Sequence, residues 1–119
     1  IEDHEAADIY QAMYWVPAHC GELEAHLGIC HFDWAVNHGV QGAMATLQQS
    51  LGVPADGVFG PVTRRALDSE LPGQVVIRYL ELRRRWYRDR AQAEPDQAKF
   101  LMGWLGRVER LDSYLENLG

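Results

Sequence analysis

The first half of this 119-residue chain contains no lysine and no arginine. Residues 1–60 hold eight Asp and Glu and all five His, giving a net charge of −8, whereas residues 61–119 hold all eleven basic residues and carry +2. The total is −6. Because phosphate affinity needs a basic surface, this balance argues against a nucleic-acid partner. It also removes the cationic surface that helps a protein approach an anionic cell wall.

Long apolar runs are missing as well. No stretch reaches the roughly 18 apolar residues of a membrane-spanning helix, so none is predicted. No signal peptide is visible, and the start at Ile1 rather than Met is typical of a processed or partial chain. The sequence has no phosphate loop, nucleotide fingerprint or Ser-His-Asp order, so no cofactor is predicted. With 47% hydrophobic residues, including four Trp, residues 1–119 can form one domain with a core.

Cysteine is scarce, with only Cys20 and Cys30. A disulfide between them would fit an exported protein, whereas we favour two free thiols, because a chain with a good core does not need the bridge. His26 and Cys30 are four apart, and zinc accepts such nitrogen and sulfur ligands. The spacing matches no closed zinc motif, so we predict no metal site and keep a zinc-binding regulator as a minor alternative.

The spacing of apolar residues is helical almost throughout. It predicts six helices, over about residues 3–14, 22–37, 40–51, 61–70, 74–91 and 95–117. The second is apolar on nearly every side and is therefore expected to be the buried central helix. The sequence thus predicts an all-α fold, a compact bundle of about six helices.

The fifth predicted helix has one apolar stripe, formed by Val76, Tyr79, Leu80, Arg83 and Tyr87. The arginine run 83–85 lies near the expected end of this helix, where arginine complements the helix dipole. Because acidic residues flank the run, we interpret it as a solvated face rather than a nucleic-acid site.

The most informative pattern lies within residues 47–67, which read L-Q-x-x-L-G-V-x-x-D-G-x-F-G-P-x-T-x-x-A-L. Gly52 can close one helix in the left-handed region, and Asp56 with Gly57 forms a turn pair. Pro61 suits the first turn of the next helix. The pattern resembles the signature of peptidoglycan-binding modules in bacterial cell-wall enzymes, which implies a link to murein.

Three further segments extend the resemblance. Residues 5–15 read E-A-x-x-I-Y-x-x-x-Y-W, residues 32–39 read F-D-x-A-V-N-x-G, and residues 103–108 read G-W-x-x-R-V. In this order they resemble glycoside hydrolase family 108, the lysozyme-like N-acetylmuramidases of phages and bacteria, some once labelled secretion activators. The resemblance covers nearly the whole chain. It implies the fold of the C-terminal, peptidoglycan-binding part of these muramidases, located in the periplasm or cell envelope or associated with a phage.

The sequence departs from the family at one decisive point. The family's catalytic glutamate belongs to an E-G-G motif upstream of the first segment, and this sequence contains no E-G-G. Glycoside hydrolysis needs a carboxylic acid to protonate the leaving oxygen. We therefore name no catalytic residue and leave enzymatic activity open. Asp33 is the only acid within the apolar central helix, but we favour a structural or ligand-contacting role for it over catalysis.

The resemblance suggests five substrate-binding residues. Asp33, Asn37 and His38 would face the glycan, and Tyr14 and Trp15 could stack on sugar rings. Each has a plainer alternative, since the aromatic pair could belong to the core and Asn37 could cap its helix.

We therefore expect a peptidoglycan-associated domain of a muramidase or endolysin, which binds glycan strands or completes the cleft of a catalytic segment. The alternative is a degenerate, non-enzymatic relative that acts as a protein–protein interaction or structural subunit. The absent glutamate and the net charge of −6 favour this alternative.

Overall fold

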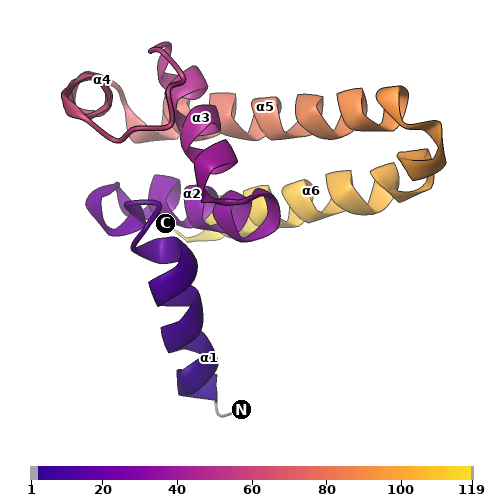
Figure 1. Cartoon of the computed structure of the whole chain (residues 1–119), viewed down its shortest axis with the longest axis horizontal. Coiled ribbons are helices and arrows are strands. Elements are labelled where there is room, and N and C mark those ends of the chain that lie inside the picture. The colour runs from indigo at the N-terminus through magenta and orange to yellow at the C-terminus, as the bar shows by residue number, and fades with distance from the viewer. Residues whose placement is uncertain (1–2, 119) are drawn as a thin grey trace.

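The computed structural model describes residues 3–118, with side chains from Glu5 onward, and within them it is helical with no strand (Figure 1). The all-α class is confirmed. The α-helices are α1 (Asp3–Tyr10), α2 (Ala25–His38), α3 (Val40–Leu51), α4 (Pro61–Ser69), α5 (Pro72–Ala93) and α6 (Leu101–Asn117). Three short segments of other pitch connect them: the π-helical η1 (Gln11–Trp15) and the 3₁₀ turns η2 (Cys20–Glu22) and η3 (Pro95–Phe100).

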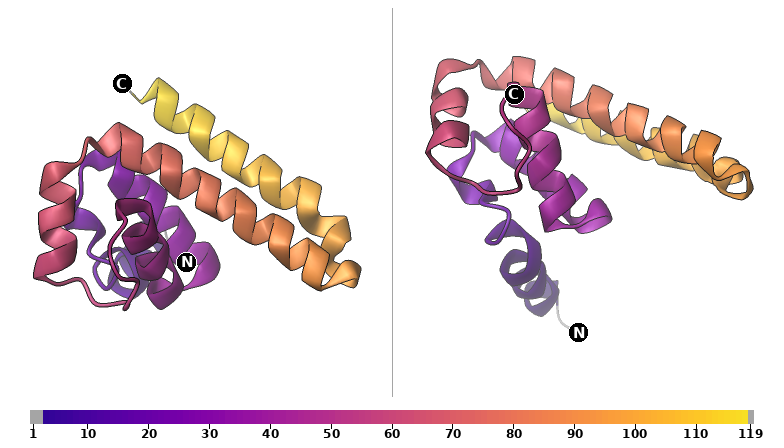
Figure 2. Two further views of the ribbon diagram at one scale, coloured as in Figure 1. Left: turned by 90° about the horizontal axis from the view of Figure 1, so that it is seen from above. Right: turned by 45° about the horizontal axis from the view of Figure 1, so that its top comes forward.

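The helices α2, α3 and α5 pack on one another and form the body, and α6 packs along α5. Because α5 is longer than the body, α5 and α6 extend beyond it as an antiparallel pair (Figure 2). The core lies where α2, α3 and α5 meet, and Trp34, Leu47 and Tyr79 are each almost fully buried there. The stripe predicted for α5 is buried along its whole length, and α5 is the longest helix within residues 3–118.

Local signals set most helix ends close to the predicted positions. Gly39 (φ 102°) separates α2 from α3, and Gly52 (φ 74°) closes α3 in the left-handed region. Gly57 (φ 79°) occupies the predicted turn, and Pro61 begins α4. The start of α2 is later than predicted because the carboxylate of Glu24 accepts the first backbone N–H groups of the helix.

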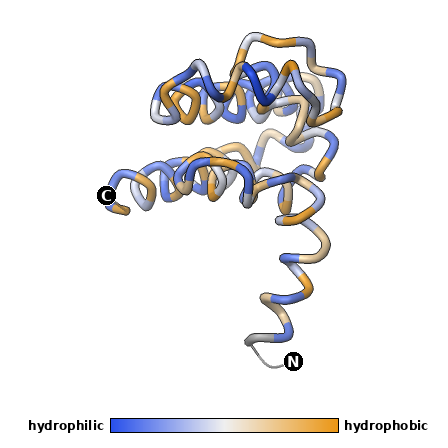
Figure 3. The backbone as a smooth tube through the Cα atoms, turned by 90° about the vertical axis from the view of Figure 1, so that its left-hand side faces the viewer, coloured by the Kyte–Doolittle hydropathy of each residue, from blue (hydrophilic) through white to orange (hydrophobic). Residues whose placement is uncertain are grey.

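The first helix projects from the body (Figure 1). Ile9 and Met13 share the helical spacing of an apolar face, yet Ile9 is 46% exposed and Met13 is 56% exposed. Along the backbone tube, hydrophobic segments recur on this projecting helix (Figure 3). The amphipathic spacing therefore identified a helix correctly here, but the apolar side of that helix is exposed rather than buried.

None of the helices in residues 3–118 is long and apolar enough to cross a membrane.

Candidate functional site

The candidate site lies where α2, α5 and α6 run side by side. Two successive turns of α2 contribute to it. In the first turn, Asp33 on α2 accepts hydrogen bonds from two arginines. Arg83 Nη1 on α5 lies 2.9 Å from Asp33 Oδ2, and Arg107 Nη2 on α6 lies 3.1 Å from Asp33 Oδ1. We call these three residues the ionic layer. Its carboxylate is held by two guanidinium groups, one from each of the helices α5 and α6.

The predicted solvated face of the arginine run is wrong for Arg83. The Arg83 side chain is fully buried, and its guanidinium carbon lies 4.6 Å from the ring centre of Trp34. Its Nε and Nη2 have no hydrogen-bond partner among residues 3–118. The helix continues ten residues beyond it, so Arg83 is not at a helix end. A buried cation needs a partner of opposite charge, and Asp33 is that partner. Arg83 in turn neutralises the Asp33 carboxylate from inside the protein.

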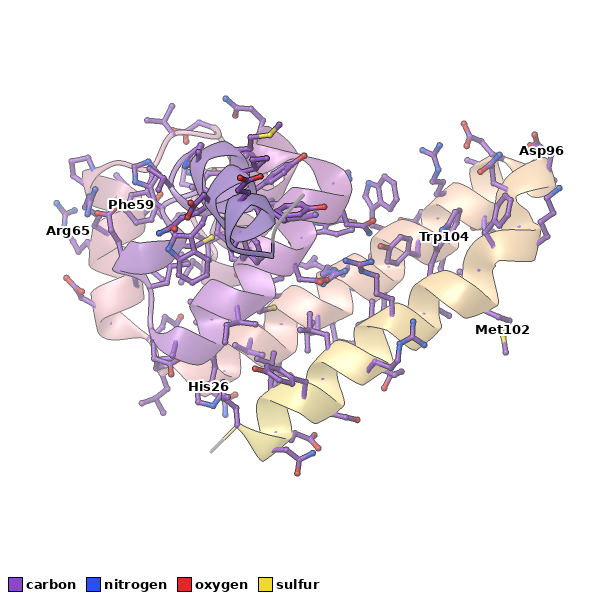
Figure 4. The ribbon with its side chains drawn as sticks, turned by 90° about the horizontal axis from the view of Figure 1, so that it is seen from below. His26, Phe59, Arg65, Asp96, Met102 and Trp104 are labelled. Carbon is purple, nitrogen blue, oxygen red and sulfur yellow. The ribbon has the colours of Figure 1, made fainter. Side chains whose placement is uncertain are left out.

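One turn further along α2 is the aromatic layer, formed by Asn37, His38, Trp86, Tyr87 and Trp104. Asn37 Nδ2 donates to the hydroxyl of Tyr87, whose ring stacks on Trp104 at 5.2 Å between ring centres. His38 stacks on Trp34 at 4.3 Å and meets the edge of Trp86 at 4.6 Å. Figure 4 shows Trp104 on the part of α6 that runs beside α5.

The His38 ring is held in a low-dielectric setting next to positive charge. Burial lowers its pKa below the ordinary value, and the charges of Arg83 and Arg90 lower it further. A neutral ring can both donate and accept a hydrogen bond. The side chain rests against Gly42, where a Cβ would lie only 2.4 Å from His38 Cδ2.

Two neighbouring hollows open onto these layers. The first, of about 530 Å³, is an apolar groove between the N-terminal segment and α2, with Asp33 and Arg107 at its polar side. The second, of about 420 Å³, is lined mainly by the aromatic layer and Arg90. Val36 lines the first hollow and Asn37 the second, so the two hollows lie on adjacent faces of the same turn of α2.

Four of the five predicted residues line these hollows. Trp15 and Asp33 line the groove, and Asn37 and His38 line the aromatic hollow. Tyr14 lines neither, because it packs against the core and stacks on Tyr10. This is the plainer alternative stated above for Tyr14, whereas Trp15 both packs against the core and lines the groove.

Helices α5 and α6 contribute site residues that were not predicted from the sequence. Trp86 and Arg90 supply the far side of the aromatic hollow, and Trp104 and Arg107 join the two layers from α6. Trp104 and Arg107 are three apart within the quoted G-W-x-x-R-V segment, so they share a helix face. That spacing was the signal that could have identified them.

Other histidines and cysteines belong to the core or the edge of the body. His31 Nε2 lies 3.0 Å from the carbonyl oxygen of Ala18, and its Nδ1 lies 2.7 Å from the Tyr79 hydroxyl. Burial lowers the pKa of His31 to about 4.

Both thiols are buried and unpaired, and burial raises the pKa of Cys20 and of Cys30 to about 12. His26 instead lies beside Glu24 at the edge of the body. Within residues 3–118 no three His, Cys, Asp or Glu converge on a metal position, so the geometry does not favour the zinc alternative.

Fold and site together define an all-helical domain with its site between a central helix and a two-helix arm. Residues 42–109 match the family described as a predicted peptidoglycan domain, and residues 1–39 match glycosyl hydrolase 108. Since the first match covers more than half of the chain, the chain belongs to the predicted peptidoglycan domain family, and the resemblance to glycoside hydrolase family 108 is confirmed.

No curated protein matches the chain. Among solved structures, SagA from Brucella abortus is similar, with 26% sequence identity and a TM-score of 0.85. The similarity covers 98% of this chain, and this chain spans 65% of the length of that structure.

Proposed function

We propose that this chain is the peptidoglycan-associated domain of a lysozyme-like muramidase or endolysin, and that it binds glycan strands across the two hollows. The observation that carries the proposal is the origin of the site residues. Asp33, Asn37 and His38 come from the segment that matches glycosyl hydrolase 108, whereas the residues of α5 and α6 come from the segment that matches the peptidoglycan domain. Each hollow is therefore lined by residues of both matched segments, although Arg107 is the single contribution of the second segment to the apolar groove.

The chemistry of the aromatic hollow suits a sugar. Pyranose rings present C–H faces that pack on aromatic rings, and Trp86 and Trp104 are only half-buried, so part of each indole is open to solvent. The Asn37 amide, the neutral His38 ring and the Arg90 guanidinium stand beside them as hydrogen-bonding groups for hydroxyl and N-acetyl oxygens.

The apolar groove suits a different task. Trp15, Phe32 and Val36 dominate its lining, with Asp33 and Arg107 fixed at one side. We propose that this groove completes the cleft of the family's catalytic segment, with the glycan running from there into the aromatic hollow.

We propose that the chain in hand binds without cleaving. The family's general acid belongs to an E-G-G motif that the present sequence does not contain. Both carboxylate oxygens of Asp33 are engaged in ion pairs with arginines. These observations support a role in contact and positioning.

The test is retention of the chain on purified peptidoglycan sacculi, with a turbidity assay on the same sample. We expect retention without clearing, and about tenfold weaker retention for Trp104→Ala, because a stacked sugar face is lost. The matched control is Tyr114→Ala, an exposed aromatic on the same helix that lines neither hollow. Clearing would mean that a carboxylate of this chain acts as the acid. Absence of retention would leave only the interaction-subunit alternative.

A further inference from the structure

A third groove, unrelated to the glycan site, lies at the opposite end of the α5–α6 pair. It has a volume of about 510 Å³ and forms where the first turns of α5, the last turns of α6 and the start of α2 meet. Its lining residues are Glu24, His26, Pro72, Gly73, Val76, Ile77, Asp112, Leu115 and Glu116. We call it the acidic groove. It shares no lining residue with the two hollows of the candidate site.

The floor of the acidic groove is apolar. Val76 and Leu115 are buried and form this floor, while Ile77 is 58% exposed at the wall of the groove. Just beyond it, Leu71 is 72% exposed and Leu118 is 41% exposed. Covering apolar side chains gathered in this way with another apolar surface removes them from water, which is favourable.

The rim of the groove is negative. Glu24, Asp112 and Glu116 line it, and no Lys or Arg does. Arg84, which is bonded to this rim through Asp112 at 3.2 Å, is shared with Glu109 at 2.8 Å and Glu81 at 2.7 Å, neither of which lines the groove. Glu24 lies 2.6 Å from His26 Nδ1. Three carboxylates therefore line the groove, and the guanidinium beside Asp112 is shared with two more outside it. Figure 4 places His26 beside the C-terminal end of α6, on this side of the molecule.

We propose that the acidic groove binds an amphipathic helix of a partner protein that carries Lys or Arg on both sides of its apolar stripe. An apolar floor between two helices accepts the apolar stripe of a third, whose residues recur every three or four positions. The carboxylates of the rim would pair with the flanking cations, which steers association and fixes orientation.

A second copy of this chain is a poor occupant on the same grounds. Its projecting helix α1 is the segment with an exposed apolar face, yet α1 carries Glu5 and Asp8 and, like all of residues 1–60, no Lys or Arg. Docking α1 into the acidic groove would place carboxylates against carboxylates, which opposes association.

The test uses two fluorescein-labelled peptides of about 15 residues with the same leucine stripe, one with lysine and one with glutamate at the flanking positions. Fluorescence anisotropy is measured with the full chain at low and at high salt. We expect saturable binding of the lysine peptide, about tenfold weaker binding at high salt, and no binding of the glutamate peptide.

Variants locate the site. Ile77→Asp removes an exposed apolar wall and Glu116→Lys reverses an exposed rim charge, and each should weaken binding about tenfold or more. The matched controls are Val62→Asp, an exposed apolar residue on α4, and Glu5→Lys, an exposed acid on α1. All four positions are on the surface, so thermal unfolding should be alike. Equal weakening by the controls, equal binding of both peptides, or self-association of the chain without peptide binding would overturn the proposal.

Discussion

At the scale of single residues, the side chains that face the hollows are held in place by buried or closely packed neighbours. Asp33 is oriented by an arginine that never reaches solvent, and His38 is pressed between Trp34 and the bare backbone of Gly42. Arg83 does not line the hollow that Asp33 faces, whereas His38 is held between Trp34, which lines the same hollow, and Gly42, which does not. The ligand-facing atoms are thereby preorganised, which reduces the entropy lost on binding.

Gly42→Ala tests this arrangement. Alanine normally stabilises a helix interior by about 1 kcal/mol relative to glycine. Here the new Cβ would lie 2.4 Å from His38, whose ring cannot move away without leaving its stack on Trp34. We therefore expect a loss of about 1–3 kcal/mol in the free energy of urea unfolding, together with weaker retention on sacculi.

The control for this substitution is Gly103→Ala on α6, where nothing lies within 4 Å of an added Cβ. That variant should be as stable as the original or more stable, by up to about 1 kcal/mol. If Gly42→Ala behaved in the same way, the packing argument for His38 would be wrong.

At the scale of elements, the pattern in residues 47–67 has a structural role that does not depend on any ligand. The buried amide of Gln48 bonds to the whole loop that joins α3 to α4. Its Oε1 accepts the backbone N–H of Gly57 at 2.9 Å, and its Nε2 lies 2.9 Å from the carbonyl oxygen of Val58 and 3.1 Å from Thr63 Oγ1. The same side chain also bonds to Asp56 at 2.9 Å. The conjunction of L-Q, D-G and a following threonine therefore has one structural cause.

Gln48→Leu should remove this support while keeping a side chain of similar size. The backbone groups of Gly57 and Val58 would lose their partner, so we expect a loss of about 2–4 kcal/mol in unfolding free energy. Amide hydrogen exchange at Gly57 should also accelerate. Gln49→Leu, at the exposed neighbouring position of α3, should change stability by no more than about 0.5 kcal/mol. Equal effects of the two substitutions would contradict this account.

How much the sequence revealed also depended on the element. The bounds of α3 and the start of α4 were predicted correctly because Gly52, Gly57 and Pro61 act through their own backbone preferences. The exposure of α1 was not predicted, because an apolar face says nothing about whether another element covers it. The roles of Trp86 and Arg83 were also missed, because which aromatic faces a hollow and which arginine is buried depend on how α5 packs against α2 and α6.

At the scale of the whole molecule, His31 connects parts that are distant in sequence. Its two ring nitrogens lie within hydrogen-bond distance of the segment before η2 and of α5, while its own helix is the centre of the body. In the neutral ring, Nε2 carries the proton and donates it to the carbonyl of Ala18, which leaves Nδ1 as the acceptor facing the Tyr79 hydroxyl. That hydroxyl also lies 3.4 Å from the carbonyl oxygen of Ala43, a longer and weaker contact. Protonation would put a charge into the core and reverse the bond between His31 and Tyr79.

Stability should therefore fall in mild acid. The pKa of His31 is about 4 in the folded chain, whereas an unfolded histidine titrates near 6.5. Below about pH 6.5 the unfolded state binds more protons than the folded state, so the free energy of unfolding decreases until the pH reaches about 4. Between about pH 7 and about pH 5 this group should cost about 2 kcal/mol.

Urea unfolding at the two pH values measures this loss of unfolding free energy. Most of the loss should be absent in His31→Gln. His38→Gln, which replaces a less buried histidine whose pKa is also lowered, should retain most of the pH dependence. A pH dependence unchanged in His31→Gln would mean that the acid sensitivity of the whole fold arises elsewhere.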